Sequence, residues 1–150
     1  MKVLFVCTGN TCRSPMAEGI LRDIAEKRNL DIEVKSAGTS VYDGDCAAIN
    51  SKTAMAKIGI DISNHKSSAL HRDLVEESDL ILTMSLGHKE AIISSFKSSK
   101  DKVFTLIEYA YGVEKDVKDP YGKSLQVYET TRDEIYQAII QIDIVNKGRR

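Results

Sequence analysis

The chain has 150 residues, of which 42% are hydrophobic and 29% are charged, a balance typical of a soluble globular protein with one core. Its 21 basic and 22 acidic residues nearly cancel, so no overall field favours a nucleic-acid backbone or an anionic membrane. No apolar run approaches the ~20 residues that span a bilayer, and the short N-terminal run lacks the cationic leader of a signal peptide. We therefore predict a cytoplasmic monomer that binds neither nucleic acid nor membranes.

The number and spacing of the cysteines exclude further classes of protein. Cys7, Cys12 and Cys46 are too few, and odd in number, for the disulfide framework of a secreted protein. They form no C-x-x-C pair and have no histidine at zinc-ligand spacing, so we expect no metal and no cofactor. The pattern favours a reducing compartment, in which a reactive thiolate survives.

The chain opens with a strand, a loop and a helix. The continuous apolar run at residues 3–6 predicts a strand buried on both faces, as in a parallel sheet. Pro15 fits the first turn of the following helix, where a missing N–H is harmless, and the helix extends to about residue 28. Its apolar residues recur at helical spacing, namely Met16, Ile20, Leu21 and Ile24.

The middle of the chain continues this alternation. Residues 32–37 predict a second strand that closes at Gly38, and residues 47–58 predict a helix ending at Gly59. The expected apolar face of that helix carries Ile49, Met55 and Ile58. A short helix over residues 72–77 then leads to a third buried strand at residues 79–84.

The last part supplies two more helices and a fourth strand. Ser85 is expected to cap a helix by accepting a free backbone N–H, residues 97–102 to form a solvated loop, and residues 103–106 to form the strand. Residues 110–123 predict a surface loop, and a final helix spans about residues 125–145. Its expected apolar stripe is Val127, Ile135, Ala138, Ile139 and Ile142.

Strands that alternate with helices predict an α/β fold. We expect a three-layer sandwich in which helices flank a central parallel sheet of about four strands. Ligand sites in such folds lie off the carboxyl ends of the strands, and Cys7 follows the first strand.

Residues 7–14, which we call the cysteine loop, read Cys-Thr-Gly-Asn-Thr-Cys-Arg-Ser. Inward backbone N–H groups, an arginine and a helix start together make a site for a tetrahedral oxyanion, with a thiol beneath it. The loop lacks the G-x-x-x-x-G-K-[ST] pattern of nucleotide-binding loops. It instead matches C-x-x-x-x-x-R-[ST].

With its CTGNTCRSP segment near the N-terminus, the chain resembles the low-molecular-weight phosphotyrosine phosphatase family. The resemblance extends to Ser36-Ala37-Gly38-Thr39, to His65, and to Asp119-Pro120-Tyr121-Gly122. It implies one phosphatase domain over residues 1–150, with the phosphatase loop at the end of the first strand. It also implies that phosphorylated proteins are the partners and that they are hydrolysed through a cysteinyl-phosphate without a metal.

Three residues are expected to carry the chemistry. Inward N–H groups, the Arg13 guanidinium and the helix N-terminus favour the thiolate of Cys7, which attacks phosphorus in line. Arg13 presents a planar fork to two phosphate oxygens and stabilises the transition state. The resemblance assigns Asp119 as the acid that protonates the leaving group and then as the base that activates water, with Pro120 restricting its backbone.

Other residues are expected to shape the pocket. The phosphate-binding set is Thr8, Gly9, Asn10, Thr11, Cys12 and Ser14, with Tyr121 as an aromatic wall. Gly9 allows close backbone approach, Asn10 adopts the left-handed conformation, and Ser14 caps the helix and donates to the thiolate. The resemblance adds a supporting network that joins Asn10 and Ser14 to Ser36 and His65. We expect His71 and His88 to be surface residues.

Position 11 bears on the substrate. Family members acting on phosphotyrosine usually carry a bulky aliphatic residue there, whereas the arginine-phosphatase branch carries threonine, as does Thr11. A guanidinium needs hydrogen-bond partners when it leaves water, and the Thr11 hydroxyl and Asp119 can both supply one. The resemblance therefore favours a protein-arginine-phosphatase, with a phosphotyrosine-specific low-molecular-weight phosphatase as the alternative.

Two remote alternatives and one open role remain. Arsenate reductases on the same fold relay electrons through later cysteines, but none follows Cys46. A non-catalytic phosphoprotein-binding module would normally lack the nucleophile, the arginine or the acid. Cys12 is either a packing residue or the partner of a protective disulfide with Cys7.

Overall fold

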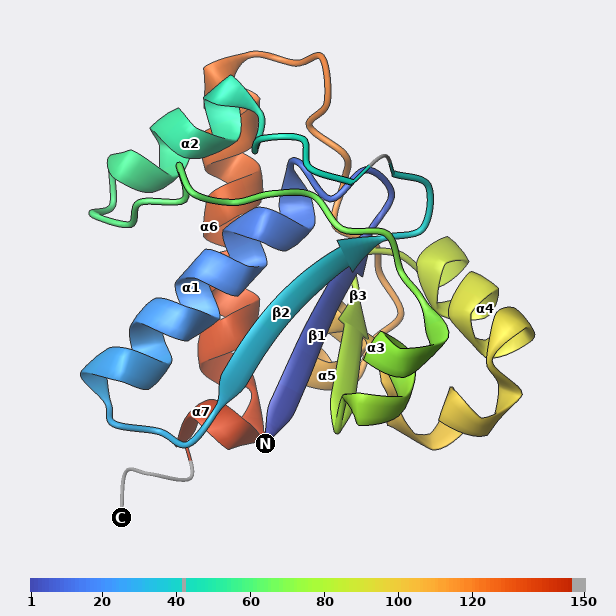
Figure 1. The fold of residues 1–150 in the computed structure, drawn as a ribbon. Helices are drawn as coiled ribbons and strands as arrows, with labels where there is room; N and C mark the ends of the chain where they lie inside the picture. The colour runs from blue at the N-terminus through green and yellow to red at the C-terminus, as the bar shows by residue number, and fades with distance from the viewer. Residues whose placement is uncertain (42, 147–150) are drawn as a thin grey trace.

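The computed structural model describes residues 1–41 and 43–146. Its centre is a sheet in the order β2-β1-β3-β4, with β1 at Lys2–Cys7, β2 at Glu33–Gly38, β3 at Leu80–Thr83 and β4 at Val103–Thr105. Each neighbouring pair of strands is parallel. The predicted α/β sandwich with a four-stranded parallel sheet is confirmed (Figure 1).

Helices cover both faces of this sheet, because successive residues of β1 point to opposite sides. Val3, Phe5 and Cys7 enter a core shared with α1 (Arg13–Lys27) and α6 (Leu125–Gln141). Leu4 and Val6 enter a second core beneath α3 (Arg72–Glu77) and α4 (Leu86–Ser95), on the other side of the sheet in Figure 1. The central strand is therefore buried on both faces, as its apolar run predicts.

The register of the sheet decides where the cysteine loop lies. Cys7 pairs with Gly38 at the end of β2, and Val6 pairs with Thr83 at the end of β3. The three strands thus end at one edge, and the segments that follow them meet there. This edge gathers residues that are far apart in the chain, such as Thr8 and His88, which are eighty positions apart.

Two helices were not expected. Thr105 ends the fourth strand and starts α5 (Leu106–Tyr111), because its hydroxyl accepts the N–H of Glu108 while the Glu108 carboxylate accepts the N–H of Thr105. The prediction of a strand through residue 106 and a loop from residue 110 is therefore wrong at both ends. Residues 97–102, expected as a loop, form the 3₁₀ helix η1 (Lys97–Lys102).

Two apolar faces are also corrected. In α2 (Ile49–Ala56) the buried side chains are Ser51, Ala54 and Met55, whereas Ile49 is 76% exposed. The final helix breaks at Ile142, whose ψ of 145° is extended, and α7 (Asp143–Asn146) follows. Val127 is exposed at the first turn of α6 rather than part of its buried stripe. No helix among the described residues is long and apolar enough to cross a membrane.

Candidate active site

A pocket of about 230 Å³ opens at the carboxyl end of β1. Two segments line it, the cysteine loop and the turn at residues 119–122, which we call the aspartate turn. The lining residues are Cys7, Thr8, Gly9, Thr11, Cys12, Arg13, Asp119 and Tyr121. The structure therefore brings the three residues with expected chemical roles into one pocket, although Asp119 lies more than a hundred positions from Cys7.

Cys7 is buried at the base of the pocket, and its Sγ lies 2.9 Å from Oγ of Ser14. The expectation that Ser14 caps α1 is wrong. The helix begins at Arg13, so Ser14 lies inside its first turn. Its hydroxyl instead accepts a hydrogen bond from Nδ2 of Asn10 at 2.8 Å. The remaining hydroxyl hydrogen of Ser14 is thus free to be donated to the sulfur of Cys7, which stabilises a thiolate.

Asn10 holds the shape of the cysteine loop from within. Its φ of 54° confirms the left-handed conformation expected for it. Its amide donates to Ser14 and also to Oγ of Ser36 at 2.9 Å, and its Oδ1 accepts the backbone N–H of Ser68. Nε2 of His65 donates to the Asn10 carbonyl oxygen at 2.7 Å. The four residues of the expected network are therefore in contact through Asn10.

Arg13 is 6% exposed and reaches across the pocket from the start of α1. Its Nη1 donates to the carbonyl oxygen of Val117 at 2.8 Å, and its Nη2 lies 3.7 Å from Oδ2 of Asp119. Its Nε is buried and has no hydrogen-bond partner among the described residues. A phosphate oxygen in the pocket would satisfy this donor, which otherwise carries a desolvation cost.

The aspartate turn contrasts with the buried loop. The side chain of Asp119 is 52% exposed, and its Oδ1 accepts the N–H of Tyr121 at 3.1 Å. Pro120 is buried, which anchors the turn, and Tyr121, which also lines the pocket, is 72% exposed. A carboxyl group in this position can exchange protons with a leaving group or a water above the pocket.

Thr11 and Cys12 form the side of the pocket next to α6. The thiol of Cys12 is buried, with its Sγ 3.4 Å from the hydroxyl of Tyr128 and 3.8 Å from Oγ1 of Thr11. Burial raises the pKa of Cys12, which keeps it a neutral thiol near pH 7. A Cβ atom at Gly9 would only make ordinary contact with Thr11, at 3.6 Å, so the protein itself does not require glycine there.

Sequence reasoning missed two residues that support the cysteine loop. His88 is not a surface residue: it is buried, and its Nε2 lies 2.8 Å from Oγ1 of Thr8. Gly38 was read only as a strand end, but a Cβ atom there would lie 2.5 Å from the Thr8 carbonyl oxygen. Their positions in the sequence could have indicated both contacts, because both residues lie at or just after the carboxyl end of a strand beside β1.

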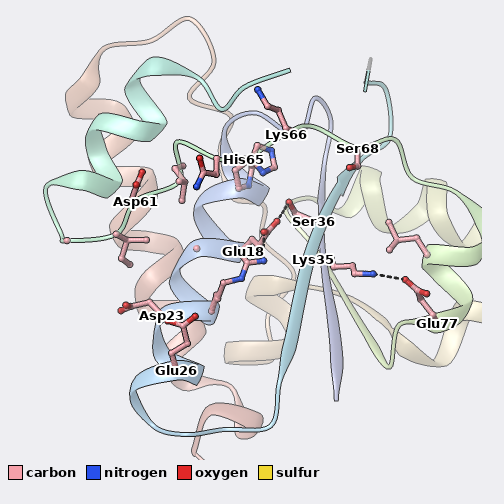
Figure 2. Close-up of a pocket in the computed structure, with 18 of the residues that line it drawn as sticks. Glu18, Asp23, Glu26, Lys35, Ser36, Asp61, His65, Lys66, Ser68 and Glu77 are labelled. Carbon is pink, nitrogen blue, oxygen red and sulfur yellow. Dashed lines mark hydrogen bonds and ion pairs between the residues drawn. The ribbon is translucent and has the colours of Figure 1, made fainter. Parts of the chain in front are cut away.

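A larger hollow of about 730 Å³ lies behind the cysteine loop, between α1, β2 and residues 59–68. Figure 2 shows Glu18 and Ser36 pointing toward each other there, and their side chains are hydrogen-bonded. The hollow contains neither Cys7 nor Arg13, so the expected chemistry lies elsewhere. Its lining still touches the loop, because Ser36 and His65 both contact Asn10.

The site defines a class of protein. A buried cysteine, an arginine beside it and an exposed carboxylate in one pocket suit the transfer of a phosphoryl group to sulfur. Among residues 1–41 and 43–146, no group of three or more histidine, cysteine, aspartate or glutamate side chains could hold a metal ion.

Comparisons with known proteins identify the family. Residues 2–146 match the model of the low molecular weight phosphotyrosine protein phosphatases. A protein-arginine-phosphatase of Bacillus subtilis is 44% identical over 95% of this chain and 94% of its own. The low molecular weight protein-tyrosine-phosphatase PtpB of Staphylococcus epidermidis is 35% identical over 95% of this chain and 96% of its own.

A solved structure agrees with these relatives. The YwlE arginine phosphatase, in a mutant whose active-site serine replaces cysteine and is phosphorylated, superposes with a TM-score of 0.94. It is 41% identical, over 100% of this chain and 97% of that one. The chain therefore belongs to the low molecular weight phosphotyrosine protein phosphatase family, and it is a cysteine-dependent protein phosphatase.

Proposed function

We propose that this protein phosphatase removes the phosphoryl group from phosphoarginine side chains, acting as one domain on phosphorylated proteins in the cytoplasm. The observation that carries the proposal is Thr11, which lines the pocket where an aliphatic wall would suit a phenyl ring. The other residues that line the pocket are polar, charged or small, except for the aromatic Tyr121. A polar wall suits a guanidinium, because that group keeps its hydrogen bonds on leaving water only where the pocket supplies acceptors.

The first half-reaction uses Cys7 and Asp119. The thiolate of Cys7 attacks phosphorus, a sulfur–phosphorus bond forms, and the bond from phosphorus to the guanidinium nitrogen breaks. The carboxylic acid of Asp119 gives its proton to that nitrogen, so arginine leaves with its ordinary protonated guanidinium side chain. Arg13 holds two phosphoryl oxygens throughout, which offsets the negative charge that develops on them.

The second half-reaction returns the enzyme to its starting state. The Asp119 carboxylate takes a proton from a water molecule, and the water oxygen attacks phosphorus as the bond to sulfur breaks. The electron pair of that bond returns to Cys7, and inorganic phosphate is the product. Ser14 assists this step, because its hydroxyl lies 2.9 Å from the sulfur that becomes the leaving group.

The substrate preference is tested by changing the wall alone. We expect Thr11→Ile to lower the ratio of kcat/KM for a phosphoarginine peptide to kcat/KM for a phosphotyrosine peptide by about tenfold to a hundredfold. Losing a hydrogen bond to a polar substrate group lowers kcat/KM more than losing the apolar contact of one methylene group does. The measurement is steady-state hydrolysis of two peptides that differ only in the phosphorylated residue. Thr11→Val is the matched control, because it keeps the branched shape and removes only the hydroxyl.

One observation favours phosphotyrosine as the second candidate. The exposed ring of Tyr121 at the rim offers an aromatic wall on which a phenyl group could stack. A wild-type enzyme that prefers the phosphotyrosine peptide, or a ratio that Thr11→Ile leaves unchanged, would contradict the arginine assignment. In that case the tyrosine activity would be the function of the same pocket.

A further inference from the structure

His88 makes a buried contact with the cysteine loop that the mechanism above does not use. It lies in the first turn of α4, three residues after Ser85, which caps that helix. One ring nitrogen, Nδ1, lies 2.8 Å from Oγ of Ser85, and the other, Nε2, lies 2.8 Å from Oγ1 of Thr8. The ring therefore bridges the helix cap to the first residue after the nucleophile.

The imidazole is neutral in this position. Its pKa is lowered to about 4, first because it is buried and then because it faces the positive charge of Arg13. Asp116 and Asp119 oppose this shift without reversing it. At neutral pH the ring thus has one N–H donor and one nitrogen acceptor.

The surrounding hydrogen bonds decide which nitrogen carries the hydrogen. Oγ of Ser85 already accepts the backbone N–H of His88 at 3.2 Å, so its own hydrogen is available for Nδ1. Among residues 1–41 and 43–146 the Ser85 hydroxyl has no acceptor besides that nitrogen. The arrangement in which Ser85 donates to Nδ1 therefore satisfies every group, and it leaves the hydrogen on Nε2.

A hydrogen on Nε2 of His88 determines how the Thr8 side chain is hydrogen-bonded. Its hydroxyl oxygen accepts the hydrogen of Nε2, and its carbonyl oxygen accepts the N–H of Ser40 at 3.0 Å. The side chain is thus held from the α4 side and the backbone from the β2 side. With Nε2 as the donor, no acceptor among the described residues takes the hydroxyl hydrogen of Thr8, so it can be donated into the pocket that Thr8 lines.

We propose that His88 is a positioning residue that fixes the Thr8 hydroxyl so that it donates its hydrogen to an oxygen of the phosphoryl group above Cys7. The proposal rests on the phosphatase mechanism of the same pocket and adds a hydrogen-bond donor to it. A donor whose orientation is set in advance stabilises the transition state without a cost of reorganisation. His88 itself touches no reacting atom and acts only through Thr8.

Two substitutions at position 88 separate the two ring contacts. His88→Asn places its amide near the position of Nδ1 and cannot reach Thr8, whereas His88→Gln places its amide nitrogen near the position of Nε2 and can still donate. We expect His88→Asn to lower kcat for 4-nitrophenyl phosphate about tenfold, and His88→Gln to retain it within about threefold. Inhibition by inorganic phosphate and thermal unfolding are measured for both variants, so that a loss of fold is separated from a loss of alignment.

Thr8 supplies an independent arm that does not depend on how the position-88 variants fold. Thr8→Val removes the hydroxyl at nearly constant shape, and we expect it to lower kcat about as much as His88→Asn, while Thr8→Ser restores most of the loss. The double variant Thr8→Val with His88→Asn is expected to be no slower than either single variant, because both changes remove one interaction.

Three outcomes would overturn the role of His88. They are equal losses for His88→Asn and His88→Gln, a wild-type kcat in Thr8→Val, or losses at the two positions that simply multiply. A wild-type protein that is inactive on aryl phosphate, phosphoarginine and phosphotyrosine alike would overturn the proposed function as well. An active enzyme with unaffected variants overturns only this inference.

Discussion

The two segments that form the pocket differ sharply in how they are held. In the cysteine loop, Cys7, Asn10 and Ser14 are buried, and Asn10 alone contacts Ser14, Ser36, His65 and Ser68. In the aspartate turn, Asp119 and Tyr121 are exposed, and within the described part of the chain the Asp119 carboxylate makes polar contacts with the Tyr121 N–H and Arg13 alone. One segment is fixed by a network, and the other by a buried proline and a few bonds.

This difference follows from what each segment is proposed to do. A phosphate cradle gains from donors whose directions are set before the substrate arrives, and burial with many contacts sets them. An acid that serves a leaving group and then a water must reach two positions, and an exposed turn can adjust without disturbing the core. The comparison predicts that changes in the loop alter stability and activity together, whereas changes in the turn alter activity alone.

The largest effect is expected at the nucleophile. Cys7→Ser should lower kcat by a factor of about 10⁴ or more, because a serine hydroxyl in this site is a far weaker nucleophile than a thiolate. Binding of inorganic phosphate should survive, since the N–H groups and Arg13 remain. Isothermal titration with phosphate and single-turnover hydrolysis measure the two properties, and retained turnover would contradict the covalent mechanism.

The next effect is expected at the acid. Asp119→Asn should lower kcat for phosphoarginine by about 10²–10³, because one positioned acid contributes on that scale. The loss should shrink for 4-nitrophenyl phosphate, whose leaving group needs little protonation. Unfolding in urea should be unchanged, because the side chain is half exposed. An equal loss with both substrates would show that Asp119 is not the proton donor.

Gly38→Ala tests how firmly the cysteine loop is held. A new Cβ atom would lie 2.5 Å from the Thr8 carbonyl oxygen and 3.1 Å from the Asn10 nitrogen, so the loop backbone must shift. We expect a loss of about 1–3 kcal/mol in the free energy of unfolding and a fall of about tenfold in kcat/KM. Gly87→Ala is the matched control, since a Cβ there meets its neighbour only at 3.7 Å. Wild-type behaviour of Gly38→Ala would remove the distinction between the two segments.

The smallest effect is expected at the rim. Tyr121→Leu should raise KM for a peptide substrate about threefold to tenfold and leave kcat nearly unchanged, because an exposed wall contributes to binding of both ground and transition states. Steady-state kinetics separate the two constants. A fall in kcat of the size seen for Asp119→Asn would mean that Tyr121 aligns the acid rather than the substrate.

The strands were the most predictable elements. The apolar runs at residues 3–6 and 79–84 are long enough to specify strands buried on both faces, and both are confirmed as β1 and β3. The elements that were missed depend on local caps. The capping box of Thr105 and Glu108 starts α5 directly after the strand. Its T-x-x-E pattern is present in the sequence but was not used in the prediction.

Helix faces were predictable where the helix is long and packed against the sheet, as for Met16 and Ile20 in α1. They failed for Ile49 and Val127, which lie in the first turns of α2 and α6 and are exposed. The helical pattern does not show whether the first turn of a helix already lies over the core, so a residue there can fit the apolar stripe and still be exposed.

By itself the sequence determined the sheet, the cysteine loop and the residue types that the chemistry needs, because strand burial, turn chemistry and nucleophile spacing are local properties of the chain. The tertiary structure decided the rest. It placed Asp119 in the same pocket as Cys7, brought His88 onto Thr8, and made Gly38 a close neighbour of the loop backbone. These contacts join segments that meet only because three parallel strands end at one edge, and the pattern within any single segment does not record that meeting.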